Sequence, residues 1–236
     1  MHSDKTPASA PRSLARRRVS LGAAALIAGS MIPFSAFAAD FPTSEVNTTG
    51  LAVTDDVVKV GILHSVTGTM SISDTGSVQA AKLAISQINA MGGVLGRKIE
   101  FIQEDGASDW PTFAEKAKKL LVSDKTAAVF GCWTSASRKA VLPVFEQYNG
   151  MLYYPTFYEG LEESPNVIYT GQEATQQIIA GIDWILKEKG AKRFKLIGSD
   201  SNRRRTTKQT ARKHTRQLGP QFVGPETHPL GHAQFH

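Results

Sequence analysis

The chain has 236 residues, of which 41% are hydrophobic, so it is long enough to bury the core of one large domain or of two lobes. Its formal net charge of +6 comes from its ends: residues 1–38 carry five Lys/Arg and one Asp, and residues 201–236 carry seven Lys/Arg and one Glu, whereas residues 39–200 carry 15 Lys/Arg and 19 Asp/Glu. Nucleic-acid binding needs a basic face on the folded domain, so the mildly acidic body argues against a nucleic acid as partner.

Residues 1–38 are predicted to be a secretory signal peptide. Four arginines at 12–18 precede an apolar run at 21–37, and the sequence Ala-Phe-Ala at 36–38 provides an A-x-A cleavage site. The run is short for a spanning helix and contains Pro33, so we disfavour a membrane anchor and expect no stable membrane insertion after cleavage. We therefore expect a periplasmic protein. The arginine cluster is loosely similar to a twin-arginine signal, which leaves the Sec and twin-arginine routes both open.

Residues 39–56 are polar and are predicted to form an irregular lead-in. After them, short β-rich apolar runs alternate with segments of helical periodicity. This alternation predicts an α/β fold in which a parallel sheet carries helices on both faces. The predicted strands are 57–63, 98–102, 127–130, 151–154, 167–169 and 194–197.

Helix boundaries can be predicted from capping residues. Asp74 is predicted to cap a first helix that ends at Gly92-Gly93, and Asp109 with Pro111 is predicted to open a second helix. Two further helices are predicted after residue 130 and around residues 178–186, where apolar side chains recur at helical spacing.

Ligands of open parallel sheets bind beyond the carboxyl ends of the strands. The sequence places four segments at that edge: 64–69, 104–106, 131–137 and 155–159. They hold the residues to consider for chemistry.

Enzymatic chemistry has little support at these positions. Cys132, the only cysteine, cannot form an internal disulfide, and as a nucleophile it would need His64 as a base. The serines at 135 and 137 lack a G-x-S-x-G context, and no P-loop or dinucleotide fingerprint occurs, so no cofactor is expected. We predict that the protein is not an enzyme.

A metal site is also not expected. His228, His232 and His236 recur at a spacing of four, but they lie in a tail that contains Pro and Gly and is not predicted to be one helix. The acidic pair Glu162-Glu163 is predicted to lie on a solvated surface.

The strand-end segments are instead neutral, polar and aromatic. Hydroxyls and free backbone N–H groups at a helix start can hold a small polar molecule, and aromatic rings can shield it from water. Such a site suits a neutral solute such as an amide or urea, since Arg138 is the only nearby counter-charge. Because alternate strand residues face opposite sides, Tyr153 and Tyr154 cannot both line a pocket.

Several long segments resemble a known family. They are VVKVGILHSVTGTMSISD at 57–74, INAMGGVLGRKIEFIQEDGASDWPTFAEKAKKLL at 88–121, GCWTSASRKAVLPVFEQYNGMLYYPTFYEG at 131–160 and SPNVIYTGQE at 164–173. Together they are similar to type I periplasmic solute-binding proteins, in particular the urea-type and short-chain amide-binding proteins of ABC importers. The resemblance implies two α/β lobes that close on a solute, and the importer's permease subunits as partners.

The resemblance also implies the ligand contacts. The positions that match the family's pocket are Trp133, Ser135, Tyr154, Thr156 and Phe157, with Tyr154 facing the ligand and Tyr153 the core. The implied solute is urea or a short-chain amide. Two alternatives remain: a sensor of the same fold that binds branched-chain amino acids or amides, and an exported amide hydrolase that uses Cys132 or Ser135.

The chain departs from the family after residue 200. Where the family has pocket aromatics, residues 201–205 read Ser-Asn-Arg-Arg-Arg, and the chain stops at His236, well before full members end. We therefore expect a first lobe at 57–170 that is mostly present, and only the start of a second lobe at 171–236, with a divergent basic tail from 201. Such a truncation would leave an uncovered apolar face and would weaken solute binding.

Overall fold

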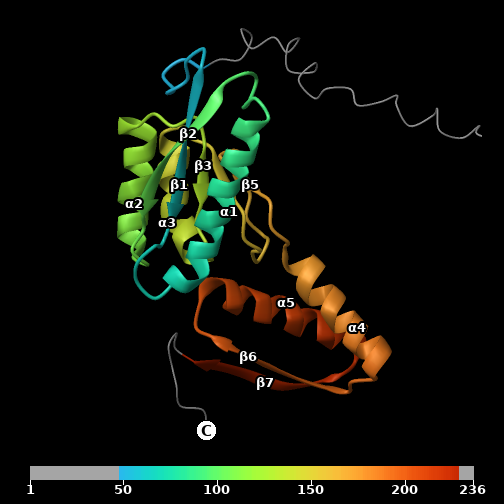
Figure 1. Cartoon of the computed structure of the whole chain (residues 1–236). Coiled ribbons are helices and arrows are strands. Elements are labelled where there is room, and N and C mark those ends of the chain that lie inside the picture. Colours follow the sequence, from blue (N-terminus) through green and yellow to red (C-terminus); the bar gives the residue numbers. More distant parts are fainter. Residues whose placement is uncertain (1–47, 229–236) are drawn as a thin grey trace, which may run out of the picture.

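The computed structural model describes residues 48–228 (Figure 1). The predicted signal peptide and the histidines at 232 and 236 lie outside the described residues. Within residues 48–228, no helix has both the length and the apolar character that crossing a membrane requires.

A five-stranded parallel sheet forms the larger part of the molecule. Its strand order is β2-β1-β3-β4-β5, and every adjacent pair is parallel. This confirms the predicted α/β fold with a parallel sheet. The strands are β1 (Val57–His64), β2 (Lys98–Asp105), β3 (Val129–Gly131), β4 (Leu152–Tyr154) and β5 (Val167–Tyr169).

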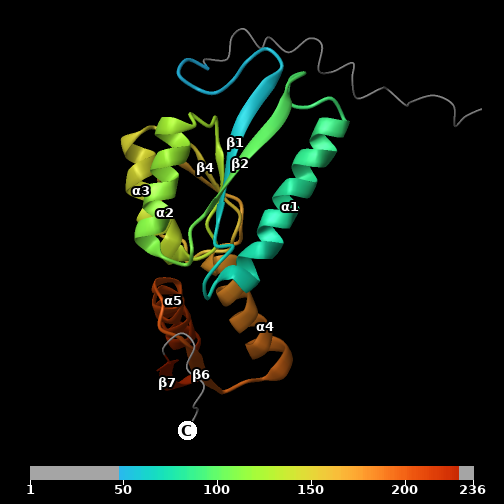
Figure 2. The ribbon, with the colours of Figure 1, turned by 60° about the vertical axis from the view of Figure 1, so that its left-hand side comes forward.

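Helices cover both faces of this sheet (Figure 2). Helix α1 (Ser71–Ala90) lies on one face, where Val78 and Ile85 pack against Val60 and Ile62 of β1. The main core lies on the other face, under α2 (Trp110–Lys118), its π-helical continuation η3 (Lys119–Ser123) and α3 (Ser135–Gln147). Its fully enclosed side chains include Leu63, Phe113, Leu120, Val141, Phe145 and Leu152.

The capping predictions were partly wrong. Asp109 does cap α2, because its carboxylate accepts the N–H of Thr112 at 3.0 Å. Asp74, however, lies inside the first turn of α1, which begins at Ser71, and its carboxylate instead accepts the N–H of Ser65 at 2.6 Å. The buried loop after β1 needs this acceptor, so Asp74 is bound to a distant N–H and not to its own helix.

An apolar stripe on the α1 face of the sheet is left open. Phe130, Tyr153 and Ile168 continue the row of Ile62 across β3, β4 and β5, in direct register. Phe130 is 36% and Ile168 42% exposed, and the Phe130 and Tyr153 rings stack with centroids 5.0 Å apart. These side chains form a partly exposed apolar stripe on this face of the sheet.

A smaller unit follows β5. It consists of η4 (Thr175–Ile179), α4 (Ala180–Lys189), β6 (Arg193–Ser199), α5 (Asn202–Leu218) and β7 (Gln221–His228), and β6 and β7 form a parallel pair. The sequence did not predict α5 or β7. Helix α5 carries seven Lys or Arg residues between positions 203 and 216 and no acidic residue. The buried side chains of the whole smaller unit are few, among them Ile182 of α4 and Ala211 and Thr215 of α5, so this unit has a thin core.

Candidate functional site

The carboxyl ends of the five parallel strands meet at the edge of the sheet that faces α4 and α5 (Figure 1). Parallel pairing forces this arrangement, because every strand runs in the same direction. The segments that follow β1, β3 and β4 therefore lie together, as the sequence predicted, and they form the candidate site.

The turn after β3 is tightly constrained. A Cβ on Gly131 would lie 2.2 Å from the carbonyl oxygen of Leu63, so only glycine allows β3 to approach β1 here. Cys132 follows with a positive φ of 65°, is fully buried, and donates its backbone N–H to Leu63 O. Burial raises the pKa of its thiol to about 12. The thiol therefore stays protonated at neutral pH and is a poor nucleophile.

His64 does not act as the base that a cysteine nucleophile requires. It is 1% exposed, and burial lowers its pKa to about 4. Its Nδ1 lies 4.0 Å from Asp74 Oδ2, and no hydrogen bond connects it to Cys132 within the described part of the chain. The geometry therefore gives no support to an amide hydrolase built on these two residues.

We expect Cys132 to react very slowly with iodoacetamide in the native protein at pH 7.5. A pKa near 12 reduces the thiolate population roughly a thousandfold relative to an unfolded cysteine, and full burial blocks access as well. Mass spectrometry of the protein labelled with and without denaturant measures both rates. Rapid native labelling would contradict this prediction and would revive the hydrolase hypothesis.

Helix α3 begins beside this turn. Thr134 is its N-cap: its Oγ1 accepts the N–H of Ser137 at 2.9 Å, and Ser137 Oγ donates to Thr134 O at 2.8 Å. These bonds fix the orientation of Trp133 and Ser135 on either side of the cap.

An aromatic group lines the edge between β3 and β4. The Trp133 and Phe157 rings meet edge to face, 6.4 Å apart, and both side chains are partly exposed. Thr156 is buried, with its Oγ1 3.5 Å from Cys132 O. Tyr154 is completely buried, and its hydroxyl donates to Trp133 O at 2.8 Å.

The expectation that Tyr153 faces the core and Tyr154 the ligand needs correction. The two tyrosines do lie on opposite faces of the sheet, but Tyr154 belongs to the main core and Tyr153 lies on the partly open α1 face. The main core lies under α2 and α3, which cover the Tyr154 face, whereas no helix covers Tyr153 as fully. Only the hydroxyl end of Tyr154 reaches the strand edge.

Arg138 is the centre of a buried network that the sequence did not predict. Its side chain is 0% exposed and forms ion pairs with Glu159 at 3.1 Å and Glu162 at 2.6 Å. Ser135 Oγ donates to the other oxygen of Glu159 at 2.5 Å. The network ties α3 to the loop after β4, and it means that Arg138 is already neutralised and is not a counter-charge for a ligand.

Aromatic rings surround the Arg138 guanidinium. The Tyr154, Tyr158 and Tyr169 centroids lie 4.7, 5.3 and 5.8 Å from its central carbon. The prediction that Glu162 is solvated was wrong. Its side chain is 9% exposed, and its carboxylate also accepts hydrogen bonds from Lys139 Nζ and the Tyr169 hydroxyl. Despite its burial, hydrogen bonds from Arg138 and Lys139 hold the Glu162 pKa at about 2.

The depressed Glu162 pKa predicts a specific loss of stability in acid. A carboxylate that titrates near 2 when folded and near 4.5 when unfolded stabilises the fold above about pH 4.5, and this contribution disappears as the pH falls towards 2. We expect Glu162→Gln to be less stable than the natural chain at pH 6, with a difference that shrinks steadily below pH 4.5. Urea unfolding at several pH values tests this, and a difference independent of pH would contradict it.

Asp105 organises the loop after β1. Its Oδ1 accepts the N–H groups of Val66 and Ala107 at 2.9 and 2.8 Å, and its Oδ2 accepts the Thr67 hydroxyl at 2.6 Å. Hydrogen bonds from Thr67 and these N–H groups keep its pKa below the usual value. The signal in the sequence was its place directly at the end of a strand, but its three loop partners could not be predicted.

Arg203 brings the smaller unit against this edge. Its guanidinium carbon lies 3.9 Å from the centre of the Phe157 ring, and its Nη2 donates to Gln177 Oε1 at 3.0 Å. No carboxylate of residues 48–228 lies within ion-pair distance of Arg203. A cation therefore stands where the resemblance led us to expect an aromatic side chain.

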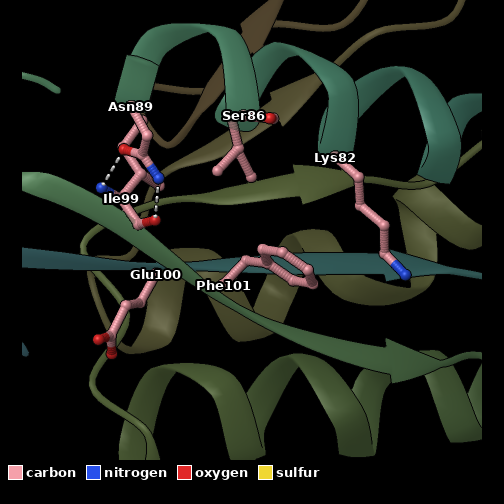
Figure 3. A pocket seen from close by; sticks show the side chains of 7 residues that line it. Lys82, Ser86, Asn89, Ile99, Glu100 and Phe101 are labelled. Atoms are coloured by element: carbon pink, nitrogen blue, oxygen red, sulfur yellow. Dashed lines mark hydrogen bonds between the residues drawn. The ribbon is translucent and has the colours of Figure 1, made fainter. Parts of the chain in front are cut away.

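Two cavities lie away from the predicted ligand residues. One of about 560 Å³ lies between α1 and the first half of β2, where Asn89 donates to Ile99 O and accepts its N–H and Lys82 covers Phe101 (Figure 3). The other, of about 460 Å³, lies between α4, β6 and α5. In the described residues, no cluster of three or more His, Cys, Asp or Glu side chains could hold a metal ion.

Residues 58–236 match a family model described as "Periplasmic binding protein domain". A Leu/Ile/Val-binding protein homolog 7 of Brucella melitensis is 30% identical over 105 aligned positions, and the match covers 41% of this chain and 26% of the relative. The chain thus matches about a quarter of the length of this curated relative.

Solved structures share the fold. A branched-chain amino acid transporter substrate-binding protein of Streptococcus pneumoniae, in complex with isoleucine, has a TM-score of 0.66 and 22% identity over 77% of this chain and 52% of its own. A solute-binding protein of Rhodopseudomonas palustris in complex with 3,4-dihydroxybenzoic acid has a TM-score of 0.68 and 23% identity over 77% and 50%.

Proposed function

Because the chain belongs to the periplasmic binding protein family, we propose that it is an extracytoplasmic solute-binding protein, or part of one, that delivers a small solute to the permease subunits of an ABC importer. Its place would be the periplasm, where the proposed signal peptide would direct it. It would bind its solute without catalysis, in keeping with the buried and protonated Cys132.

The solute that the first sheet supports best is urea or a short-chain amide. The observation that carries this is the charge pairing on the β3–β4 side of the edge: Arg138 and Lys139 pair with Glu159 and Glu162, so this side presents mainly aromatic rings and hydroxyls. A small amide needs such donors and acceptors and no fixed counter-charge.

The five predicted contacts would contribute in different ways. The rings of Trp133 and Phe157 are partly exposed at the edge and would cover the solute. Ser135, Tyr154 and Thr156 are buried and bonded within the protein, so they would act mainly by presenting their remaining acceptor positions and by fixing the shape of the edge.

A second candidate is a solute with a carboxylate, such as a branched-chain amino acid. The observation that favours it is Arg203, a cation directly over Phe157 that forms no ion pair within residues 48–228. The isoleucine and dihydroxybenzoic acid complexes of the structural neighbours agree with this class.

Calorimetry on residues 39–236 tests the proposal and separates the two solutes. We expect weak but saturable binding of urea or acetamide, which Trp133→Ala abolishes and which Trp184→Ala, a change at a 54% exposed tryptophan of α4, leaves unchanged. Binding of isoleucine without binding of amides would favour the second candidate. No saturable binding of either class by the folded chain would overturn both.

A further inference from the structure

Charge is divided unequally between the two parts of the molecule. Residues 48–174, which hold the five-stranded sheet, carry 10 Lys/Arg and 14 Asp/Glu, a net charge of −4. The smaller unit at 175–228 carries 12 Lys/Arg and four Asp/Glu, a net charge of +8. Because the smaller unit lies beyond the carboxyl ends of the strands (Figure 1), the molecule is acidic at one end and basic at the other.

The carboxylates of the smaller unit are already used within it. Each of them contacts a Lys, Arg or His side chain of the same unit. They are Asp183, Glu188, Asp200 and Glu226. No acidic side chain of residues 175–228 is therefore left over for the remaining cations.

Much of the excess charge lies along one side of α5. Four cations of this helix, at positions 205, 212, 213 and 216, are exposed and follow the spacing i, i+7, i+8, i+11, which places them on one side of a helix. At 1.5 Å per residue they span about 17 Å. We call Arg205, Arg212, Lys213 and Arg216 the basic stripe.

The basic stripe is largely uncompensated. Arg205 pairs with Asp200 at 2.6 Å, and the guanidinium carbon of Arg212 lies 5.6 Å from the centre of the Phe222 ring. In residues 48–228, neither Lys213 nor Arg216 forms an ion pair. Like charges four positions apart on a helix repel each other, as Arg212 and Arg216 do, so a dense negative surface would stabilise this side of the helix.

We propose that the basic stripe docks the smaller unit on an anionic lipid bilayer, with its cations at the lipid phosphates and without insertion of the helix. Groups of four to eight Lys/Arg on one helix are typical of anionic-lipid binding, and each cation near the surface adds to the affinity. The only apolar residues of α5 are Ala211, which is buried, and Leu218. The helix therefore lacks the broad apolar face that an inserted interfacial helix needs.

The choice of a lipid surface rests on the proposed function, because an exported partner of a membrane importer works beside a bilayer. A single-stranded nucleic acid fits the stripe less well. Its bases stack on aromatic side chains, and α5 contains no Phe, Tyr or Trp.

Cosedimentation with lipid vesicles at pH 7.5 tests the proposal on residues 39–236. Residues 1–38 are left out because their arginines and apolar run would themselves bind vesicles. We expect at least about tenfold stronger partitioning onto phosphatidylcholine vesicles with about 30% phosphatidylglycerol than onto phosphatidylcholine alone. This partitioning should fall at least about tenfold between about 50 and about 500 mM salt, because screening shortens the reach of the cations.

Two variants test the stripe itself. The triple change Arg212→Gln, Lys213→Gln and Arg216→Gln should lower partitioning onto the anionic vesicles at least about tenfold. The double change Arg212→Lys and Arg216→Lys should keep it, because a bilayer responds to charge and not to the fork shape of a guanidinium. Circular dichroism and the urea unfolding midpoint establish that each variant is folded.

The matched control removes three charges from the other part of the molecule. Lys98, Lys118 and Lys125 are exposed cations of residues 48–174, and changing all three to glutamine should leave partitioning unchanged. Solute binding by the same samples is measured by calorimetry. A chain that binds solute but no vesicles would overturn the docking proposal alone, and a chain that binds vesicles but no solute would overturn the proposed function alone.

Three further results would overturn the docking proposal. Equal partitioning onto neutral and anionic vesicles would show that charge does not drive binding. Tighter binding of duplex DNA than of anionic vesicles, at equal phosphate concentration, would make the stripe a nucleic-acid surface. Salt-sensitive self-association that the triple glutamine variant abolishes, without vesicle binding by the natural chain, would assign the stripe to a second copy of this chain.

Discussion

Arg138→Met should lower the free energy of unfolding by about 3–5 kcal/mol, the usual cost of breaking a buried ion pair by removing one partner. Methionine fills part of the space but leaves the carboxylates of Glu159 and Glu162 without their common cation, and Glu159 is only 4% exposed. The three tyrosine rings around the guanidinium also lose their cation–π contact. Urea unfolding followed by circular dichroism measures the change.

The matched control for this change is Lys139→Ala. Lys139 contacts the same Glu162 at 2.6 Å, but its side chain is 42% exposed, so we expect a loss of no more than about 1 kcal/mol. Equal effects of the two substitutions would contradict a special role for burial. Near-natural stability of Arg138→Met would show that the network contributes little to the fold.

Gly171→Ala should destabilise the chain and disturb the candidate site together. A Cβ at this position would lie 2.2 Å from the carbonyl carbon and oxygen of Thr156 and 2.5 Å from the backbone nitrogen of Phe157. Backbone atoms cannot rotate away as a side chain can, so the peptide unit that joins Thr156 to Phe157 must move. We expect a loss of about 1–3 kcal/mol and weaker solute binding at the strand edge, measured by urea unfolding and by calorimetry.

Gly76→Ala is the control for the extra methyl group. Gly76 lies in α1, where a Cβ would meet no atom within 4 Å, so alanine should raise stability by up to about 1 kcal/mol. If Gly171→Ala left stability and binding unchanged, the close contact between residue 171 and the loop would not exist in solution.

The strand-end edge could be predicted from the sequence, but its internal bonding could not. Periodicity located the strands, and parallel pairing then forced the segments after residues 63, 130 and 154 to meet. Whether a polar side chain there is free or already bonded depends on partners far along the chain. Ser135 was predicted as a contact, yet its hydroxyl bonds to Glu159, 24 residues away.

Arg138 is a second case in which the sequence could not show whether a side chain is free or already paired. As a lone arginine beside the site, it could be read as a counter-charge for a ligand. The fold brings Glu159 and Glu162 back over α3, which cancels that charge, and it brings Arg203 from α5 onto Phe157, which supplies another. The net charge of the edge is therefore a tertiary property.

The sequence by itself determined the α/β class, the five strands of the parallel sheet and the edge at which their carboxyl ends meet, because these follow from local periodicity and strand direction. Only the tertiary structure decided which polar groups at that edge are satisfied, that Cys132 is buried and protonated, that Tyr154 belongs to the core, and that residues 202–228 form a helix and a strand. Hydrogen bonds, ion pairs and burial join residues that are distant in the chain, and no local pattern records those distances.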